Sequence, residues 1–227
     1  LNLGYIYSMK KLNANFLSIV VPVFNEKELI EQTLFDISEV CRQICTGDKK
    51  FEILVVNDGS TDGSDSIAKN LSKSITELKV IDLAINSGHM AALTAGYKVA
   101  GGEWIATMDA DGQDPPKYLV EMMAKVNKEN ADICYGIRND RKSDALRHRI
   151  FSPIYYKFLN LSTNKQAPSQ AADFRLISKR VLEQLNGLNE SNRIFRVLIP
   201  DLKFASTYIY YSRNPRVAGK SKYGFRK

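Results

Sequence analysis

The chain has 227 residues, of which 44% are hydrophobic and 25% charged, and its formal net charge is +7. This composition suits one globular domain with a substantial core, and it excludes disordered, collagen-like and repeat architectures. No stretch of the sequence approaches the 18 consecutive apolar residues of a membrane-spanning helix.

The positive charge is concentrated at the carboxyl end. From residue 213 to 227 there is no acidic residue, and six residues are basic: Arg213, Arg216, Lys220, Lys222, Arg226 and Lys227. Such an end suits anionic lipid or a phosphorylated ligand. The long interleaved basic and aromatic pattern of nucleic-acid-binding proteins is lacking, so we expect no nucleic-acid partner. Because the chain opens on Leu1 and stops in this basic stretch, we expect a piece of a longer protein, with membrane anchors after Lys227.

Apolar runs and helical periodicities alternate along the first 138 residues. Strands are predicted at 16–24, 51–57, 78–84, 103–109 and 131–138, and helices at 26–45, from about 62, at 90–100 and at 116–127. This alternation predicts an α/β domain with a mostly parallel central sheet and flanking helices. Ligands of such sheets bind beyond the carboxyl ends of the strands, so we expect the site at loops 22–26, 57–62 and 109–114.

Residues 145–161 are predicted to form two short amphipathic helices. Proline inside a helix costs about 3 kcal/mol, so Ser152 and Pro153 indicate a helix start rather than a helix middle. Two interpretations stay open for this segment. Its apolar face either covers the sheet or lies in a membrane interface, with arginine and lysine toward the headgroups.

The stretch "MDADGQDPP" (108–116) places three carboxylates within six residues. Their repulsion is unfavourable unless a positive charge lies nearby. Along an extended segment Asp109 and Asp111 point to the same side, where two carboxylates can hold Mg²⁺ or Mn²⁺ against substrate phosphates. Asp114, before a double proline, is predicted to cap the next helix. The stretch therefore predicts a metal–diphosphate site.

Several other chemistries lack their motifs. The sequence has no Walker loop, no GxGxxG, and only two histidines, His89 and His148, without an HExxH pattern or a Ser/His/Asp arrangement. Proteolysis, zinc hydrolysis and nicotinamide chemistry are therefore excluded as leading interpretations. A nucleotidyltransferase is disfavoured too, because no glycine loop is present for a nucleoside triphosphate.

Six motifs occur in order: "IVVPVFNE" (19–26), "VVNDGSTDGS" (55–64), "NSGHMAALTAG" (86–96), "MDADGQDPP" (108–116), "ADFRLISKRV" (172–181) and "RVAGKSKYG" (216–224). Together they resemble the family-2 inverting glycosyltransferases of GT-A fold. The resemblance covers about residues 16–224 and is strongest to the polyprenyl-phosphate branch, which includes dolichol-phosphate mannose synthase and the bactoprenol glucosyltransferases.

The resemblance implies a donor site and a metal site that share residues. The nucleotide-sugar residues it implies are Pro22, Phe24, Glu26, Asp58, Asp109, Arg216 and Lys222. A Mg²⁺ or Mn²⁺ ion would be held by Asp109, Asp111 and Gln113. The sequence departs from the family pattern at Asn57, where many members have aspartate, and at Gly112, where leucine is usual.

The resemblance also implies an acceptor site and catalytic residues. The lipid phosphate would be received by Arg138, Arg147, Arg149 and Ser152, and the catalytic residues would be Asp111 and Asp173. Asp173 lies where inverting relatives often carry their base. Its alternative role is a structural ion pair with Arg175 or another arginine.

The implied activity is metal-dependent transfer from a nucleotide diphosphate sugar, preferably a UDP-sugar, to polyprenyl (undecaprenyl) phosphate at the cytoplasmic face of the plasma membrane. The expected organisation is an extension over 1–15, a GT-A catalytic domain over 16–212 and a basic juxtamembrane and active-site loop over 213–227. Two alternatives stay open: a glycan or protein acceptor, and a non-catalytic scaffold that binds nucleotide or lipid. The sequence does not decide whether the chain forms a homo-oligomer.

Overall fold

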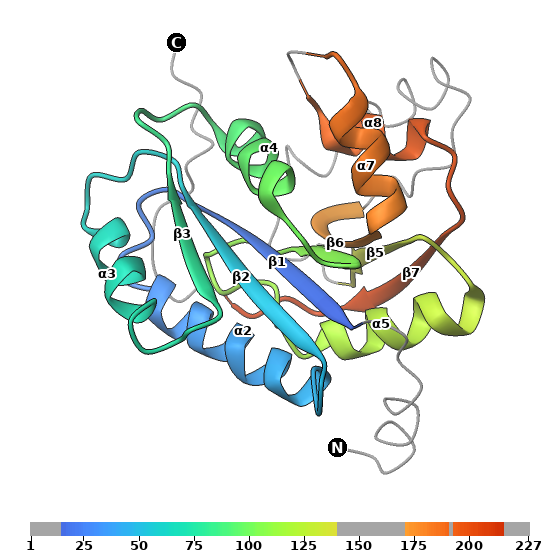
Figure 1. Cartoon of the computed structure of the whole chain (residues 1–227), viewed down its shortest axis with the longest axis horizontal. Coiled ribbons are helices and arrows are strands. Elements are labelled where there is room, and N and C mark those ends of the chain that lie inside the picture. The colour runs from blue at the N-terminus through green and yellow to red at the C-terminus, as the bar shows by residue number, and fades with distance from the viewer. Residues whose placement is uncertain (1–14, 140–170, 191–192, 216–227) are drawn as a thin grey trace.

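A seven-stranded sheet runs through the middle of the chain (Figure 1). The computed structural model describes residues 15–139, 171–190 and 193–215. The strands are β1 (Phe16–Val23), β2 (Lys50–Asn57), β3 (Leu78–Asp82), β4 (Trp104–Thr107), β5 (Ile133–Arg138), β6 (Ala171–Ser178) and β7 (Ser206–Tyr211). The helices are α2 (Ile30–Ile44), α3 (Ser64–Leu71), α4 (His89–Val99), α5 (Tyr118–Glu129), α7 (Lys179–Gly187) and α8 (Phe195–Asp201).

The strand order is β3-β2-β1-β4-β6-β5-β7. The pairs β2–β3, β1–β2, β1–β4 and β5–β7 are parallel, whereas β6 is antiparallel to both β4 and β5. The predicted α/β class with a mostly parallel sheet is therefore confirmed. The sequence did not predict that β6 enters between β4 and β5 in the opposite direction.

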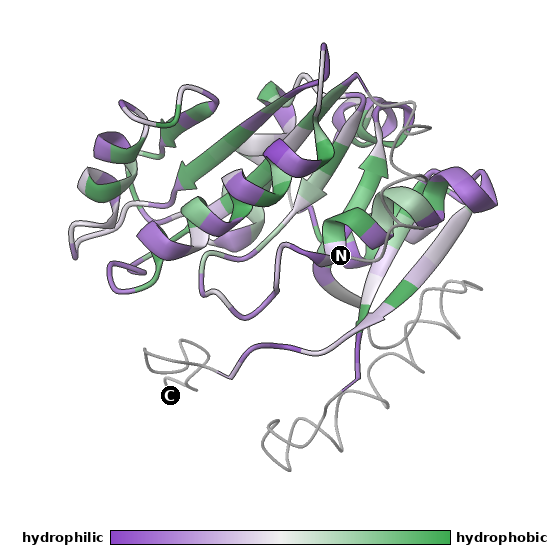
Figure 2. Ribbon diagram, turned by 90° about the horizontal axis from the view of Figure 1, so that it is seen from below, coloured by the Kyte–Doolittle hydropathy of each residue, from purple (hydrophilic) through white to green (hydrophobic). Residues whose placement is uncertain are grey.

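Two hydrophobic cores lie on the two faces of the sheet, because alternate residues of each strand point to opposite sides. In β1, Leu17, Ile19 and Val21 face the layer of α2, α3 and α5, whereas Val20 faces α4 with Val56 of β2. Figure 1 shows these helices on opposite sides of the sheet, with α7 and α8 beside α4. Figure 2 shows hydrophobic strands and helices that turn hydrophilic residues outward. Burial on both faces explains why β1 is a nearly continuous apolar run.

Helix α4 packs unusually close to β1. A Cβ atom built on Gly96 would lie 2.4 Å from Cγ1 of Val20, so only glycine permits this approach. The close packing fixes the position of His89, the first residue of α4, at the edge of the sheet where β1, β2 and β4 end.

Within the described ranges, no helix combines the length and the apolar character needed to cross a membrane. The predicted amphipathic segment 145–161 lies outside the described residues, as do 1–14 and 216–227. The expected domain boundaries at 16 and 212 stay predictions.

Candidate active site

The loops after β1, β2 and β4 meet at one edge of the sheet, as the sequence predicts. The Asn25 N–H donates to the Ser60 hydroxyl at 3.1 Å, and the Thr61 N–H donates to the Asn25 side chain at 2.8 Å. The Thr33 hydroxyl of α2 donates to the Ala110 carbonyl at 3.3 Å. The three loops are thus tied directly to one another or to the helix between them.

Three predicted donor-binding residues lie at the end of β1. Pro22 is buried in the strand, and Phe24 and Glu26 are half-buried in the loop that follows. The structure therefore places them at the edge where the site is expected. Their contacts with a base or a ribose stay predictions.

Asp58 organises the loop that leads into α4. Its buried carboxylate accepts hydrogen bonds from the N–H groups of Ser87 at 2.7 Å and Gly88 at 2.9 Å, and from the Asn86 amide at 3.1 Å. The chains approach closely here, since a Cβ on Gly59 would lie 2.6 Å from the backbone nitrogen of Asn86. Asp58 thus has a structural role in fixing the start of α4, and its predicted contact with base or ribose stays a prediction.

The metal loop, residues 108–114, follows the end of β4. The chain turns at Ala110 and Asp111, so the prediction that the DxD segment is extended is wrong. Gly112 has φ +66°, in the left-handed region that favours glycine, which accounts for glycine at this position. The Asp111 carboxylate accepts a hydrogen bond from the Gln113 N–H at 3.1 Å and closes the turn.

Asp109 lies among other acids, with 28% of its side chain exposed. Burial first, and then the nearby carboxylates of Asp114, Asp173 and Asp111, raise the pKa of Asp109 well above its usual range. A divalent cation offsets such an excess of negative charge, and carboxylate oxygens are the ligands that Mg²⁺ and Mn²⁺ prefer. No group of three or more His, Cys, Asp or Glu in the described ranges is arranged to hold a metal alone. The neighbouring carboxylates of Asp109 and Asp111 fit an ion that takes its other ligands from water and substrate phosphates.

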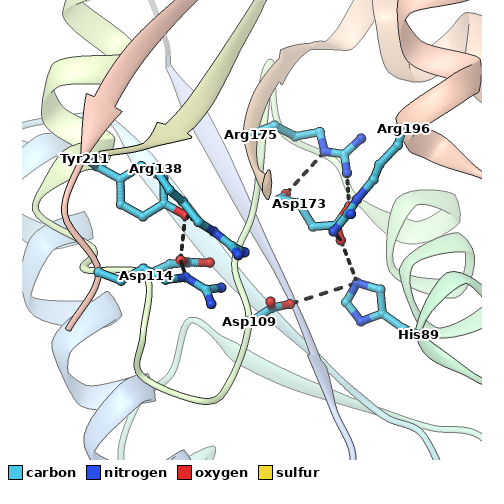
Figure 3. A network of polar contacts seen from close by, with 9 residues as sticks. His89, Asp109, Asp114, Arg138, Asp173, Arg175, Arg196 and Tyr211 are labelled. Atoms are coloured by element: carbon cyan, nitrogen blue, oxygen red, sulfur yellow. Dashed lines mark hydrogen bonds and ion pairs between the residues drawn. The ribbon is translucent and has the colours of Figure 1, made fainter. Parts of the chain in front are cut away.

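Asp173 lies near the start of β6. Because β6 is antiparallel, with Arg175 opposite Thr107 of β4, its first residues reach the same edge as the metal loop. The Asp173 carboxylate is paired with Arg175 and accepts two hydrogen bonds from Arg196, from Nε at 3.1 Å and from Nη2 at 2.5 Å (Figure 3). Burial alone would raise the pKa of Asp173, but the two arginines hold it far below its usual range. The ion pair with Arg175, given above as the alternative role, is present.

His89 points between Asp109 and Asp173 (Figure 3). Its Nε2 atom lies 3.9 Å from Oδ1 of Asp109 and 3.7 Å from Oδ2 of Asp173. Among the described residues this buried nitrogen has no hydrogen-bond partner. Burial lowers the pKa of His89 below its usual range, and the attraction of Asp173 offsets only part of this effect. The imidazole is therefore neutral at neutral pH.

Asp114 is buried beside β7. Its Oδ1 accepts hydrogen bonds from the Tyr211 hydroxyl at 2.7 Å and from Nε of Arg213 at 3.0 Å. The prediction that Asp114 caps a helix is wrong, because its carboxylate faces β7 and α5 begins at Tyr118 without a side-chain cap. Nε of Arg138 donates to the Tyr211 hydroxyl at 3.3 Å. Arg138, a predicted lipid-phosphate residue, thus lies next to the Asp114 cluster (Figure 3).

The 211–214 segment is fastened to the metal loop. Nη1 of Arg213 donates to the side-chain oxygen of Gln113 at 2.7 Å, and the Asn214 N–H donates to the Gln113 carbonyl at 2.9 Å. The Asn214 amide also donates to the Gly112 carbonyl at 3.1 Å. The predicted metal residue Gln113 is therefore oriented by Arg213.

Some predicted and observed site residues do not coincide. The predicted residues outside the described ranges are Arg147, Arg149, Ser152, Arg216 and Lys222. The sequence did not predict that Arg196 and Tyr211 lie in the site. It places Arg213 in a basic active-site loop over 213–227, and for His89 it leaves open either a contact with donor or sugar or a polar contact between loop and helix. For His89 a signal existed, since the loop after the parallel strand β3 reaches the same edge as the three loops considered. The basic stretch marked Arg213, but no local pattern identifies its partner, because Asp114 lies 99 residues away in the sequence.

Comparisons with known proteins agree with this geometry. Residues 18–185 match the model of the family described as glycosyl transferase family 2. The chain is 37% identical over 210 residues to an uncharacterized glycosyltransferase of Bacillus subtilis, YkcC, with 92% of this chain and 64% of the relative covered. It is 30% identical over 210 residues to a prophage bactoprenol glucosyl transferase homolog of Escherichia coli, with 91% and 66% covered. The chain therefore spans slightly less than two thirds of the length of these relatives.

A solved structure gives the same architecture. Glucosyl-3-phosphoglycerate synthase of Mycobacterium tuberculosis, in complex with Mn²⁺, UDP-glucose and phosphoglyceric acid, superimposes with a TM-score of 0.66. The match covers 96% of this chain and 77% of that one at 15% identity, so it bears on the fold alone. By its sequence and its sheet topology, the chain belongs to glycosyl transferase family 2 and has the GT-A fold.

Proposed function

We propose that the chain is the catalytic part of an inverting glycosyltransferase. It would move a sugar from a nucleotide diphosphate sugar, preferably a UDP-sugar, to a polyprenyl phosphate at the cytoplasmic face of the plasma membrane. Family membership supports the transfer reaction, and the relatives named bactoprenol glucosyl transferases support a polyprenyl phosphate acceptor. The preference for a UDP-sugar rests on the likeness to the bactoprenol enzymes, and the divalent metal rests on the neighbouring carboxylates of Asp109 and Asp111.

The pairing of Asp173 with two arginines is the observation that carries the choice of acceptor. A hydroxyl acceptor has to lose its proton to a base whose pKa lies near the working pH. Asp173, neutralised by Arg175 and Arg196, is too weak a base for that task. A phosphomonoester has a second pKa near 6, so it is already largely anionic at pH 7 and needs positioning rather than deprotonation.

The reaction would be one displacement at the anomeric carbon. An acceptor phosphate oxygen forms the new bond as the bond to the diphosphate breaks, which converts an α-linked donor to a β-linked product. Asp109, Asp111 and Gln113 would hold the ion, which when bound supplies positive charge to the leaving diphosphate. Arg216 and Lys222, predicted to close over the same diphosphate, follow the 211–214 segment that is fastened to the metal loop.

The acceptor side would be completed by residues outside the described ranges. Arg138 lies beside the metal loop, and Arg147, Arg149 and Ser152 are proposed to receive the lipid phosphate with it. The amphipathic segment 145–161 would contact the membrane surface. Arginine suits this role because its planar guanidinium binds phosphate oxygens in pairs.

The test uses the full-length protein with Mn²⁺ or Mg²⁺, undecaprenyl phosphate and labelled UDP- and GDP-sugars. We expect label from one donor to move into the organic phase, and neither the Asp109→Asn variant nor a reaction with EDTA to transfer it. If label is transferred only to a soluble glycan or protein, the acceptor is that molecule and not polyprenyl phosphate. Donor binding without any turnover would leave a non-catalytic scaffold.

A further inference from the structure

A gap separates Nε2 of His89 from Oδ2 of Asp173. The distance of 3.7 Å from Nε2 to Oδ2 is too long for a direct hydrogen bond, yet one oxygen atom at about 2.8 Å can contact both atoms. Nε2 is buried and has no hydrogen-bond partner among the described residues, and 28% of the His89 side chain as a whole is exposed. The gap therefore offers a buried donor and acceptor to a ligand.

The chemistry of the gap selects a hydroxyl group. Nε2 of His89 faces a carboxylate oxygen on each side, and this arrangement favours a proton on Nε2, which therefore donates. Oδ2 of Asp173 accepts, although it already receives Nη2 of Arg196. A hydroxyl is the group that accepts one hydrogen bond and donates another. A cation is disfavoured here, because Arg175 and Arg196 already neutralise Asp173.

The gap also lies where the sugar has to be. Asp109 of the metal loop is on one side of His89, at 3.9 Å, and the Asp173–Arg196 pair is on the other. In the proposed function the sugar lies between the diphosphate at the metal loop and the incoming acceptor. His89 is the side chain that borders both regions in Figure 3.

We propose that His89 and Asp173 together bind one hydroxyl of the transferred sugar, and that His89 is a specificity-determining residue for the donor. Nε2–H of His89 donates to the hydroxyl oxygen, and the hydroxyl donates to Oδ2 of Asp173. This inference rests on the proposed function, since it needs a nucleotide sugar as donor. It does not depend on the acceptor.

Two contacts hold the start of α4, and with it His89, in position. Asp58 holds the preceding loop through the N–H groups of Ser87 and Gly88, and Gly96 brings α4 against β1. A preorganised donor loses little conformational entropy on binding, so it can discriminate between sugars that differ at one hydroxyl.

The test compares binding of a nucleotide diphosphate with binding of its sugar derivative. The full-length protein is titrated calorimetrically with Mn²⁺ and UDP, and with UDP-glucose, UDP-N-acetylglucosamine and GDP-mannose. The variants are His89→Leu, His89→Gln, whose amide can donate from a similar place, and Lys98→Gln as an exposed control on the same helix. We expect His89→Leu to bind the preferred nucleotide sugar about 10-fold more weakly and UDP within about twofold of wild type. His89→Gln should recover most of the loss, and Lys98→Gln should show none.

Donors that lack one hydroxyl identify the contact. Wild-type protein should bind one deoxy-sugar donor about 10-fold more weakly than the parent donor, and His89→Leu should not distinguish the two. Equal weakening of UDP and the nucleotide sugar, unchanged binding of both, or no donor binding at all would overturn the inference. These binding experiments contain no undecaprenyl phosphate. If His89→Leu weakens only nucleotide-sugar binding while the separate transfer assay shows no lipid product, the proposed acceptor is wrong and the inference about His89 stands.

Discussion

Replacing Arg213 by methionine removes the cation that joins β7 to the metal loop. Asp114 is only 1% exposed, and it keeps the 2.7 Å hydrogen bond from Tyr211 after Arg213 is lost. Breaking a buried ion pair by removing one partner costs about 3–5 kcal/mol. Because 22% of Arg213 is exposed and the Tyr211 bond remains, we expect a smaller loss of unfolding free energy, about 2–3 kcal/mol.

The measurement is urea unfolding of the full-length protein at pH 7, followed by circular dichroism. Arg180→Met is the control, because Arg180 is 71% exposed and pairs with Asp132 at the surface, where such pairs contribute less than about 1 kcal/mol. In the double variant Asp114→Asn/Arg213→Met no unpaired buried carboxylate remains. Its loss should therefore fall short of the sum of the two single losses by at least about 1 kcal/mol.

Two results would refute this reasoning. One is a loss of unfolding free energy in Arg213→Met no larger than that in Arg180→Met, since burial of the ion pair would then make no difference to stability. The other is strict additivity in the double variant, which would mean that Arg213 and Asp114 do not interact in solution.

Three further predictions concern Asp109, Asp173 and Gly96. Asp109→Asn relieves repulsion among carboxylates, so thermal unfolding should occur at the wild-type temperature or above. Sugar transfer by this variant should fall at least about 100-fold, and a fully active variant would show that Asp109 does not hold a metal. Asp173→Asn should lower the unfolding free energy at pH 7. The pKa of Asp173 in the folded protein lies below the unfolded value of about 3.9, so its carboxylate stabilises the fold above about pH 4. In urea unfolding, the difference in unfolding free energy between wild type and Asp173→Asn should therefore narrow as the pH falls below about 4. Gly96→Ala should destabilise by about 1–3 kcal/mol despite the better helix propensity of alanine, because its Cβ meets Val20, and a higher melting temperature would contradict the packing.

The first half of the fold was predictable because its signals are local. The apolar run of β1 and the strand that ends before Asp109 are each fixed by residues close in sequence, and parallel order follows from the alternation with helices. The rule that ligands bind at the carboxyl ends of strands then placed Asp58, Asp109 and Asp111 at one edge.

The other half depended on contacts that no local pattern encodes. Asp173 was identified, but its role depends on Arg196 from α8, 23 residues later, and on a strand direction that only pairing with β4 and β5 decides. The prolines after Asp114 favour a helix cap in the sequence, whereas its partners in the structure are Tyr211, the last residue of β7, and Arg213, two residues later.

The direction of β6 has a consequence for how this enzyme can diverge. The carboxylates of the metal loop are encoded before residue 115, and Asp173 with its arginines is encoded after residue 170, although strand pairing brings the two sets together. The two sets are separated in the sequence by residues 115–172. Because the Asp173 carboxylate contributes to the raised pKa of Asp109, a substitution on one side changes the charge balance of the other, so the two sides are coupled although they lie far apart in the sequence.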